Sequence, residues 1–414
     1  MRNLQNNRRR VREAPREASG LGERDDAPSR LSWHQALRVA LATSWPVRRL
    51  FGRVWLFMDR DVEADDNAEH LYRHVLRNHP EIPARFALRP DSPDWPRLKA
   101  EGFRLVPHGS LRHRMLLLNC ERLISSGFTK SVFLLPPRLC RHVFACLGHG
   151  VTRGDNAGRI NRRPVAFWSV ATQRELDYVT AENSPFKLTR REARLTGLPR
   201  FDALHRMIGR RPGRRILFMP TWRRYLVEER GEGDTARPAK AGFEDSAYAR
   251  AVGGFLESER LADLLARHGY GLDFFPHIHM RRYFSDRTFP AGIVLAERTN
   301  GRSIQEFLGE ARLVVTDYSS IAFDAAFLGR ALVYWQFDRN DADGGDHYAK
   351  GYFDYERDGF GPVVETREDL LDALETLLER NGERGAKYAE RVERTFRFRD
   401  DKNCERVYAA IAGL

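Results

Sequence analysis

The sequence is poor in cysteine, lysine and long apolar runs, and each scarcity argues against a class of protein. The 414 residues include four cysteines, with no CxxC pair and no neighbouring histidines at zinc-finger spacing. This argues against a disulfide framework and a structural zinc site, and it fits a reducing cytoplasm. The sequence contains no apolar run of about 18 residues, which is the length that a transmembrane helix needs. The N-terminus also lacks the apolar core of a secretory signal.

Acidic residues are outnumbered, with 57 against 69 basic residues and a formal net charge of +12. Only seven of the basic residues are lysines, an arginine excess that suits phosphate contacts but that a GC-rich genome also supplies. The charge is concentrated in residues 1–60, with 13 basic and 6 acidic side chains, and in residues 190–224, with 11 arginines and 2 acidic side chains. This placement favours an anionic lipid and a phosphate-rich substrate. Nucleic acid is disfavoured because no helix-turn-helix, RNP-type or zinc module is present.

Composition and periodicity divide the chain into five segments. Residues 1–30 are predicted to be a disordered basic arm. Residues 31–50 are predicted to form an amphipathic helix that associates with a membrane, or packs on the domain behind it. Residues 51–205 and 206–395 each alternate strands with helices, which predicts an α/β fold of two Rossmann-like domains facing an interdomain cleft. Residues 396–414 are predicted to form a C-terminal helix.

The predicted membrane helix begins with capping-box spacing between Ser32 and Gln35. Trp33 and Leu37 share one face of it, and basic residues follow. Pro46 is expected to end or kink the helix, because proline lacks a backbone donor.

Hydroxyl-bearing residues follow one strand in the second half, and they form the most informative motif. The strand covers residues 313–315, a helix begins near residue 321, and Thr316, Ser319 and Ser320 lie between them. Such a turn presents hydroxyls and free backbone N–H groups at the carboxyl end of a strand, where open α/β sheets bind ligands. It predicts a diphosphate site, with simple helix capping by one serine as the alternative.

Two histidines stand in positions that suit catalysis. His149 lies between two glycines and has the pKa range of a general base. His277 follows a strand and precedes His279 by two residues, which favours a phosphate or transition-state role over metal binding, since no third ligand is near in sequence. Thr221 and Arg223 also follow a strand and are expected to face the cleft, or to serve ordinary turn chemistry.

Together these segments resemble the CDP-glycerol glycerophosphotransferase family, which includes teichoic acid primases and polymerases of bacterial envelopes. The resemblance spans roughly residues 50–400. The matching segments are residues 66–72 (D-N-x-x-x-L-Y), 147–150 (the H-G motif), 197–202 (G-x-P-R-x-D), 220–223 (P-T-W-R) and 316–320 (T-D-Y-S-S), with Asp324 and Asp338 behind the last. One departure follows the H-G motif, where the family has T-P-L-K and this chain has Arg153 as its nearby basic residue.

The resemblance implies a GT-B-like fold and transfer of glycerol phosphate, or a related alditol phosphate, from CDP-glycerol. The acceptor would be a hydroxyl of a membrane-linked molecule or a growing envelope or capsule polymer, and CMP would be released. The expected partners are the CDP-alditol, the lipid-linked or polymeric acceptor and an anionic membrane surface, at the cytoplasmic face of the cell membrane. The alternative is a GT-B glycosyltransferase that uses a nucleotide sugar for surface polysaccharide.

The resemblance also assigns roles to residues. The catalytic residues would be His149, as the base, and His277. The donor-binding set would be Thr221, Arg223, Thr316, Asp317, Ser319, Ser320 and Asp324. The acceptor-binding residues would be Arg153 and Asn67. No cofactor or metal site is expected from the sequence, and the need for a divalent metal stays open.

Overall fold

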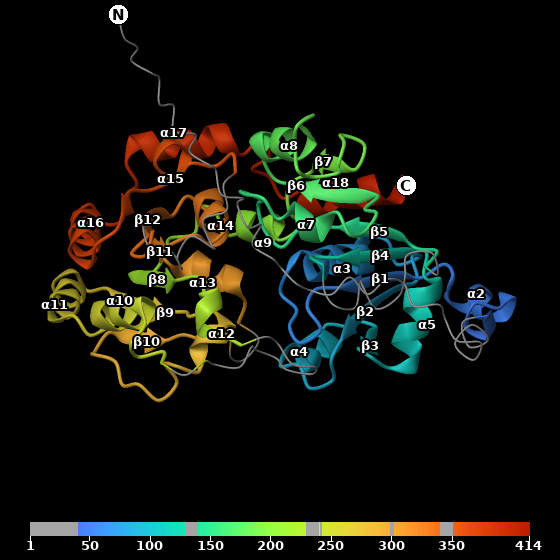
Figure 1. The fold of residues 1–414 in the computed structure, drawn as a ribbon, viewed down its shortest axis with the longest axis horizontal. Helices are drawn as coiled ribbons and strands as arrows, with labels where there is room; N and C mark the ends of the chain where they lie inside the picture. The colour runs from blue at the N-terminus through green and yellow to red at the C-terminus, as the bar shows by residue number, and fades with distance from the viewer. Residues whose placement is uncertain (1–39, 129–139, 229–239, 241, 299–301, 340–350) are drawn as a thin grey trace, which may run out of the picture. The chain divides into compact units, whose positions relative to one another are not determined.

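The computed structural model describes residues 40–128, 140–228, 240, 242–298, 302–339 and 351–414 (Figure 1). The chain forms two units, residues 1–41 and 42–414. The first unit is described only at residues 40 and 41, which are helical. The predicted arm and the predicted membrane helix up to residue 39 therefore lie outside the described residues. The second unit contains both predicted α/β domains.

Seven parallel strands form the first sheet. In spatial order they are β3 (Leu105–Pro107), β2 (Ala84–Leu88), β1 (Trp55–Met58), β4 (Arg122–Ser125), β5 (Val143–Cys146), β6 (Phe167–Val170) and β7 (Ala193–Leu195). Successive side chains point to opposite faces, so Trp55 and Phe57 pack in one apolar cluster while Leu56 and Met58 pack in another. Both faces are buried, which explains why β1 is apolar at every position.

Helices cover both faces of this sheet. One face carries α3 (Asn67–Asn78) and α4 (Asp94–Ala100), and the other carries α5 (Leu111–Asn119), α7 (Ala157–Ile160) and α8 (Gln173–Thr180). In α3, the buried Ala68, Leu71, Tyr72 and Val75 recur at helical spacing. The Asp66 side chain caps this helix by accepting a hydrogen bond from the Asn67 amide. This cap fixes the start of α3 at Asn67, which is one of the predicted acceptor-binding residues.

Six parallel strands form the second sheet. In spatial order they are β10 (Ile293–Leu295), β9 (Gly271–Phe274), β8 (Arg215–Met219), β11 (Leu313–Thr316), β12 (Ala331–Trp335) and β13 (Val363–Val364). One face packs against α10 (Ala247–Leu256), α11 (Glu259–His268) and α16 (Arg367–Glu379) (Figure 1). The other packs against α9 (Phe201–His205), α13 (Ile304–Glu310), α14 (Ile321–Phe327) and α17 (Ala386–Thr395). The short helices η2 (Arg224–Leu226), α12 (Ile278–Arg281) and α15 (Tyr355–Asp358) lie in loops between these elements.

Both sheets follow the strand order of a Rossmann fold. The order along each sheet is third, second, first, fourth, fifth and sixth strand of its domain, with β7 added to the first sheet. The prediction of two Rossmann-like domains in a GT-B-like arrangement is confirmed. In such sheets the strand order reverses between the first and fourth strands, and ligands bind beside the carboxyl ends there. Those switch points lie between β1 and β4, and between β8 and β11.

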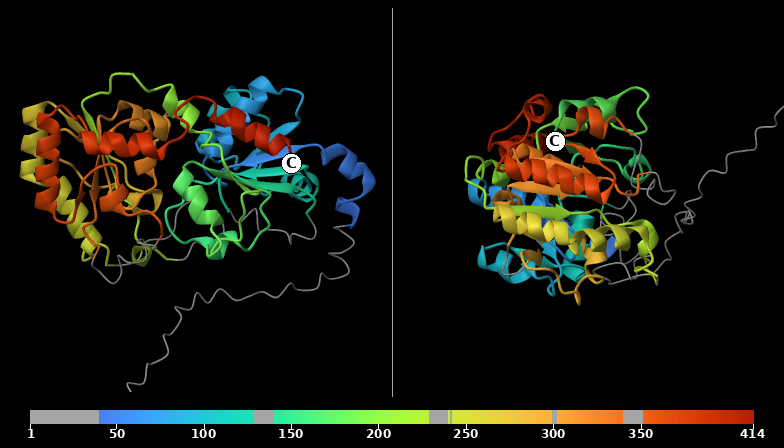
Figure 2. Two further views of the ribbon diagram at one scale, coloured as in Figure 1. Left: turned by 90° about the horizontal axis from the view of Figure 1, so that it is seen from above. Right: turned by 90° about the vertical axis from the view of Figure 1, so that its left-hand side faces the viewer.

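The C-terminal segment returns to the first sheet. Helix α17 contributes Val392 to the core of the second domain, whereas α18 (Asn403–Ala412) contributes Val407 and Ile411 to the cluster around β1 and α3. Figure 2 shows this last helix, in red, next to the C-terminus and beside the first domain. The Asp202 carboxylate, on α9, accepts hydrogen bonds from the amides of Asn403 and Cys404 at the start of α18. The predicted C-terminal helix therefore begins later than residue 396 and belongs by packing to the first domain.

Two local expectations differ from the structure. The predicted helix of residues 31–50 is not continuous: helical residues 40–42 are followed by a break at residues 43 and 44. The break lies just before Pro46, as expected, and Pro46 stands in the first turn of a new helix, α2 (Trp45–Phe51), where its missing N–H is not needed. Helix α9, placed in the first domain by sequence, packs against α13 and α14 of the second. Among the described residues, no helix combines the length and the apolar character needed to cross a membrane.

Candidate functional site

The site residues of the first domain lie beside the carboxyl end of β1. Asp59 is buried there, and its carboxylate accepts hydrogen bonds from the amides of Asp66, Ala68 and Glu69 at the start of α3. The hydroxyl of Ser126, which follows β4, donates to the same carboxylate. Burial and the neighbouring Asp66 raise the pKa of Asp59. This arrangement, at the switch point of the sheet, fixes the position of Asp66.

His149 lies in the loop after β5 and pairs with Asp66. Its Nδ1 atom contacts the Asp66 carboxylate, and its Nε2 atom lies 3.2 Å from an Arg60 guanidinium nitrogen. The imidazole is 62% exposed, whereas Asp66 is 12% exposed. Burial acts to raise the pKa of Asp66, but His149 and Arg200 outweigh it and lower that pKa to about 2. The ionised Asp66 thus holds the Nδ1 side of a solvent-accessible histidine.

Asn67 ties the His149 loop to the next segment of the site. Its amide nitrogen donates to the Gly148 carbonyl at 2.8 Å, and its amide oxygen accepts from the Arg200 backbone at 3.1 Å. The side chain is fully buried. Gly148 has a φ of +72°, a conformation that glycine adopts readily. In this conformation the Asn67 side chain holds the loop that carries His149 through the Gly148 carbonyl. Contact between Asn67 and the acceptor substrate stays a prediction.

Arg200 links the two domains. Its guanidinium donates to both carboxylate oxygens of Asp324 on α14, at 2.6 and 2.9 Å. It also donates to Asp66 at 2.8 Å and to the His149 carbonyl at 2.6 Å. Arg200 is buried, so these are charge-assisted bonds away from water. The predicted donor residue Asp324 is therefore joined through Arg200 to the predicted base.

The two domains also meet at the glycine that follows His149. A methyl group at Gly150 would overlap the Ser320 hydroxyl and approach the Arg200 guanidinium. Only glycine allows this close approach of the loop to the turn after β11. Nearby, Arg153 donates to the Tyr355 hydroxyl, and Gly154 pairs with Gly351 in an isolated β-bridge. The loop carrying His149 is thus in contact with the second domain.

Asp317 organises the switch point of the second sheet. Its carboxylate accepts hydrogen bonds from the Thr221 amide at 2.9 and 3.1 Å, from the Thr221 hydroxyl at 2.6 Å and from the Tyr318 amide at 2.6 Å. Thr221 follows β8 and Asp317 follows β11, so this contact joins the two strands on either side of the reversal. Ser319 and Ser320 lie on the same turn and are partly exposed.

Arg223 and Thr316 face the interior. Arg223 is fully buried and pairs with Asp317 at 2.9 Å and with Asp338. Its Nη1 atom donates to the Thr221 carbonyl at 2.7 Å. The Thr316 hydroxyl donates to the Met219 carbonyl at 2.7 Å and is buried. Both side chains support the turn in this conformation, and their direct contact with a diphosphate stays a prediction.

His277 follows β9 and caps the short helix α12. Its Nδ1 atom accepts a hydrogen bond from the His279 amide at 3.3 Å. The His277 ring lies 4.7 Å from the His279 ring and 5.9 Å from Trp222, between centroids. Because β9 and β8 are neighbours, this cluster stands at the same sheet edge as Thr221. Within the part of the chain that the structure describes, no three metal-binding side chains are gathered.

Sequence reasoning missed the residues that hold the base in place. Asp66, Arg200 and Asp59 were not assigned to the site, although Asp66 and Arg200 stand in segments that resemble family motifs. A usable signal was present: Asp66 is a capping residue, and Arg200 follows a Gly-Leu-Pro turn between the domains. Their partners lie 83 and 124 residues away, so spacing alone does not reveal the contacts.

Comparisons with known proteins identify relatives of this chain. Over 370 residues, the chain is 29% identical to the minor teichoic acid biosynthesis protein GgaB of Bacillus subtilis strain 168, covering 87% of this chain and 40% of that protein. A 64-residue segment is 38% identical to a teichoic acid glycerol-phosphate transferase of Staphylococcus aureus strain NCTC 8325, covering 16% of each. The chain therefore spans about 40% of the length of GgaB.

Solved structures show the same fold. The wall teichoic acid polymerase TagF, in a His→Ala variant, matches with a TM-score of 0.62 and 14% identity, over 91% of this chain and 96% of that one. A His→Asn variant of TagF soaked with CDPG also matches with a TM-score of 0.62, at 14% identity, over 91% of this chain and 95% of that one. The family model described as CDP-glycerol:poly(glycerophosphate) glycerophosphotransferase matches residues 42–413. The chain belongs to this glycerophosphotransferase family.

Proposed function

We propose that this protein transfers glycerol phosphate, or a related alditol phosphate, from CDP-glycerol to a hydroxyl of an envelope acceptor. The observation that carries the proposal is the Asp66–His149 pair, held against the Ser320 turn of the second domain. A base and a group of diphosphate-binding candidates then stand at adjoining sheet edges, as an in-line displacement requires. Family membership supports the choice of donor.

In the proposed reaction, an acceptor hydroxyl attacks the β-phosphorus of the donor. His149 takes the hydroxyl proton at Nε2, while Asp66 keeps the ring oriented and stabilises the imidazolium that forms. The bond between the β-phosphorus and the bridging oxygen breaks, and CMP leaves with that oxygen. Thr221, Ser319, Ser320 and His277 are the candidates for holding the diphosphate and offsetting its developing charge.

The proposal also covers which residue binds the acceptor and which segment attaches the enzyme to the membrane. Arg153 is the candidate acceptor contact, since it lies four residues after His149 in the same loop. The segment of residues 31–50, which includes most of α2, would bring the enzyme to an anionic membrane at its cytoplasmic face. Deletion of residues 1–50 should abolish pelleting with phosphatidylglycerol vesicles. Unchanged pelleting would contradict this location.

Nucleotide release tests the reaction. The purified protein is incubated with an acceptor extract and, in parallel, with CDP-glycerol, CDP-ribitol and UDP-sugars. We expect CMP from a CDP-alditol, and release at no more than a small residual rate from His149→Ala, whose far-UV spectrum should match that of the wild type. His268→Ala, at the end of α11, is the matched control and should keep full activity. Release of UDP instead of CMP would favour the nucleotide-sugar alternative, and near-wild-type turnover of His149→Ala would remove His149 from the mechanism.

A further inference from the structure

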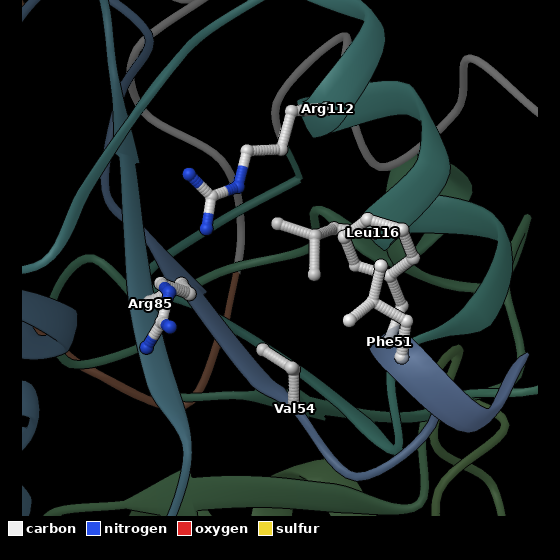
Figure 3. Close-up of a pocket in the computed structure, with 6 residues that line it drawn as sticks. Phe51, Val54, Arg85, Arg112 and Leu116 are labelled. Atoms are coloured by element: carbon white, nitrogen blue, oxygen red, sulfur yellow. The ribbon is translucent and has the colours of Figure 1, made fainter. Parts of the chain in front are cut away.

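A cavity of about 210 Å³ lies beside α2, and the proposed reaction does not use it. It is lined by Leu50, Phe51, Val54, Arg85, Arg112 and Leu116. Figure 3 shows the arginine side chains on one side of the cavity and Phe51, Val54 and Leu116 on the other. Val54 directly precedes β1, and Arg85 is the second residue of β2. The cavity thus opens at the amino-terminal ends of these strands, at the sheet edge opposite the candidate active site.

The basic side of this cavity has no carboxylate partner in the part of the chain that the structure describes. Arg85 is half-buried and donates one hydrogen bond to its neighbour, the Ala84 carbonyl, at 2.8 Å. Burial and the like charges of Arg104 and Arg112 lower the pKa of Arg85. No carboxylate among the described residues forms an ion pair with any of these three arginines. An anion placed between Arg85 and Arg112 would relieve their repulsion and accept directed hydrogen bonds.

The surface around the cavity is apolar and strongly exposed. Of the large apolar side chains that the structure describes, the three most exposed are Leu111 at 76%, Leu50 at 72% and Trp45 at 71%. Leu50 and Trp45 belong to α2, and Leu111 begins α5, which packs on α2. Helix α2 also carries Arg48 and Arg49 in its last turn and no acidic residue in its first. Apolar side chains interleaved with arginine are typical of a surface that meets anionic lipid.

We propose that this cavity binds one anionic phospholipid, with its phosphate between Arg85 and Arg112 and the start of an acyl chain against Phe51, Val54 and Leu116. The inference deepens the membrane partner of the proposed function and rests on it. A discrete lipid site would anchor the first domain at the edge away from the reaction, which leaves the edge with His149 open to substrates. Charge complementarity selects the anionic lipid, because a headgroup without net charge would leave the positive charge of the two arginines uncompensated.

The test uses the full chain and a short-chain lipid in solution. Dioctanoyl phosphatidylglycerol should bind saturably in calorimetry, whereas dioctanoyl phosphatidylcholine and inorganic phosphate should bind at least about tenfold more weakly. Arg85→Gln/Arg112→Gln should weaken phosphatidylglycerol binding by about tenfold or more. The control Arg210→Gln/Arg211→Gln removes the same charge from exposed sites outside the cavity and should bind as the wild type does.

A second variant distinguishes binding in the cavity from a general attraction between the basic protein and an anionic lipid. Val54→Phe fills the apolar side without changing any charge, and it should lose phosphatidylglycerol binding while keeping CMP release from CDP-glycerol. Equal binding by the wild type, Val54→Phe and the double arginine variant would overturn the lipid site. If those proteins also pellet equally with phosphatidylglycerol vesicles, membrane association stands without the cavity. Inorganic phosphate binding as tightly as the lipid would also overturn the proposal, since a free anion would then be the ligand.

Discussion

At the scale of single residues, Asp66 decides how His149 is presented. Its carboxylate contacts the histidine Nδ1 atom, caps α3 and accepts from Arg200. A carboxylate with a pKa near 2 stays ionised throughout the neutral range. It therefore favours the tautomer with its proton on Nδ1, which makes Nε2, here facing Arg60, the basic nitrogen.

The substitution Asp66→Asn should slow the reaction through His149. The amide would keep the size of the side chain but lose the charge that orients the imidazole, and we expect kcat to fall by about 10²-fold or more. Steady-state CMP release measures this, with far-UV and unfolding controls. In the His149→Ala background the same substitution should have almost no effect on the residual rate. A full additive loss in that background would mean that Asp66 acts on something other than His149.

At the scale of elements, the loop after β5 is held by α8. Glu175, buried at the start of α8, accepts hydrogen bonds from the Thr152 amide at 2.6 Å and the Ala171 amide at 2.9 Å. Burial raises the pKa of Glu175 to about 7, against the lowering effect of these backbone donors. The loop that carries His149 is thus fastened by a carboxyl group that titrates near neutrality.

Glu175 should make stability depend on pH in a defined direction. Its folded-state pKa lies above the unfolded value, so the folded protein binds this proton more tightly. The stabilisation is complete below the unfolded pKa, near 4.5, and is lost as the pH rises through about 7. Urea unfolding across this range should show a decline in the free energy of unfolding that is smaller in Glu175→Gln. Parallel pH profiles for the two proteins would contradict the assignment.

The C-terminal helix should contribute substantially to the stability of the first domain. Ile411 of α18 is fully buried in the cluster that contains Trp55 and Leu71. Ile411→Ala leaves a cavity there and should cost about 2–5 kcal/mol of unfolding free energy. The exposed Glu405→Ala, on the same helix, should change it by less than about 0.5 kcal/mol. Chemical denaturation measures both, and equal effects would show that α18 does not pack as described.

At the scale of the whole molecule, the basic block of residues 190–224 is partly internal. Arg200 is neutralised by Asp66 and Asp324. Arg223 is neutralised by Asp317 and Asp338. The sequence suggested that this block offers its charge to a phosphate-rich substrate. In the structure, two of its arginines instead connect strands and domains, because a buried guanidinium requires paired carboxylates.

Removing the arginine that links the domains should destabilise the protein strongly. Arg200→Met leaves Asp66 and Asp324 buried without their shared partner, which should cost about 3–5 kcal/mol. Arg200→Met/Asp324→Leu should recover part of that loss, since one of the two uncompensated charges is gone. Thermal and urea unfolding measure the series. A single variant as stable as the wild type would show that the link contributes nothing.

The sequence by itself determined the family, the two Rossmann-like domains and the places where β11 and α14 begin, on either side of the hydroxyl-bearing turn. Local periodicity, capping and motif order carry that information, and all of them act over short stretches of chain. Only the tertiary structure decided which polar groups become partners. Asp66 contacts His149, and Arg200 contacts Asp324, because the loops that follow the strands of the two sheets come together in the folded chain. A charged group that is buried there requires a group of opposite charge beside it. The return of α18 to the first sheet was likewise decided by an apolar surface that only the folded chain creates.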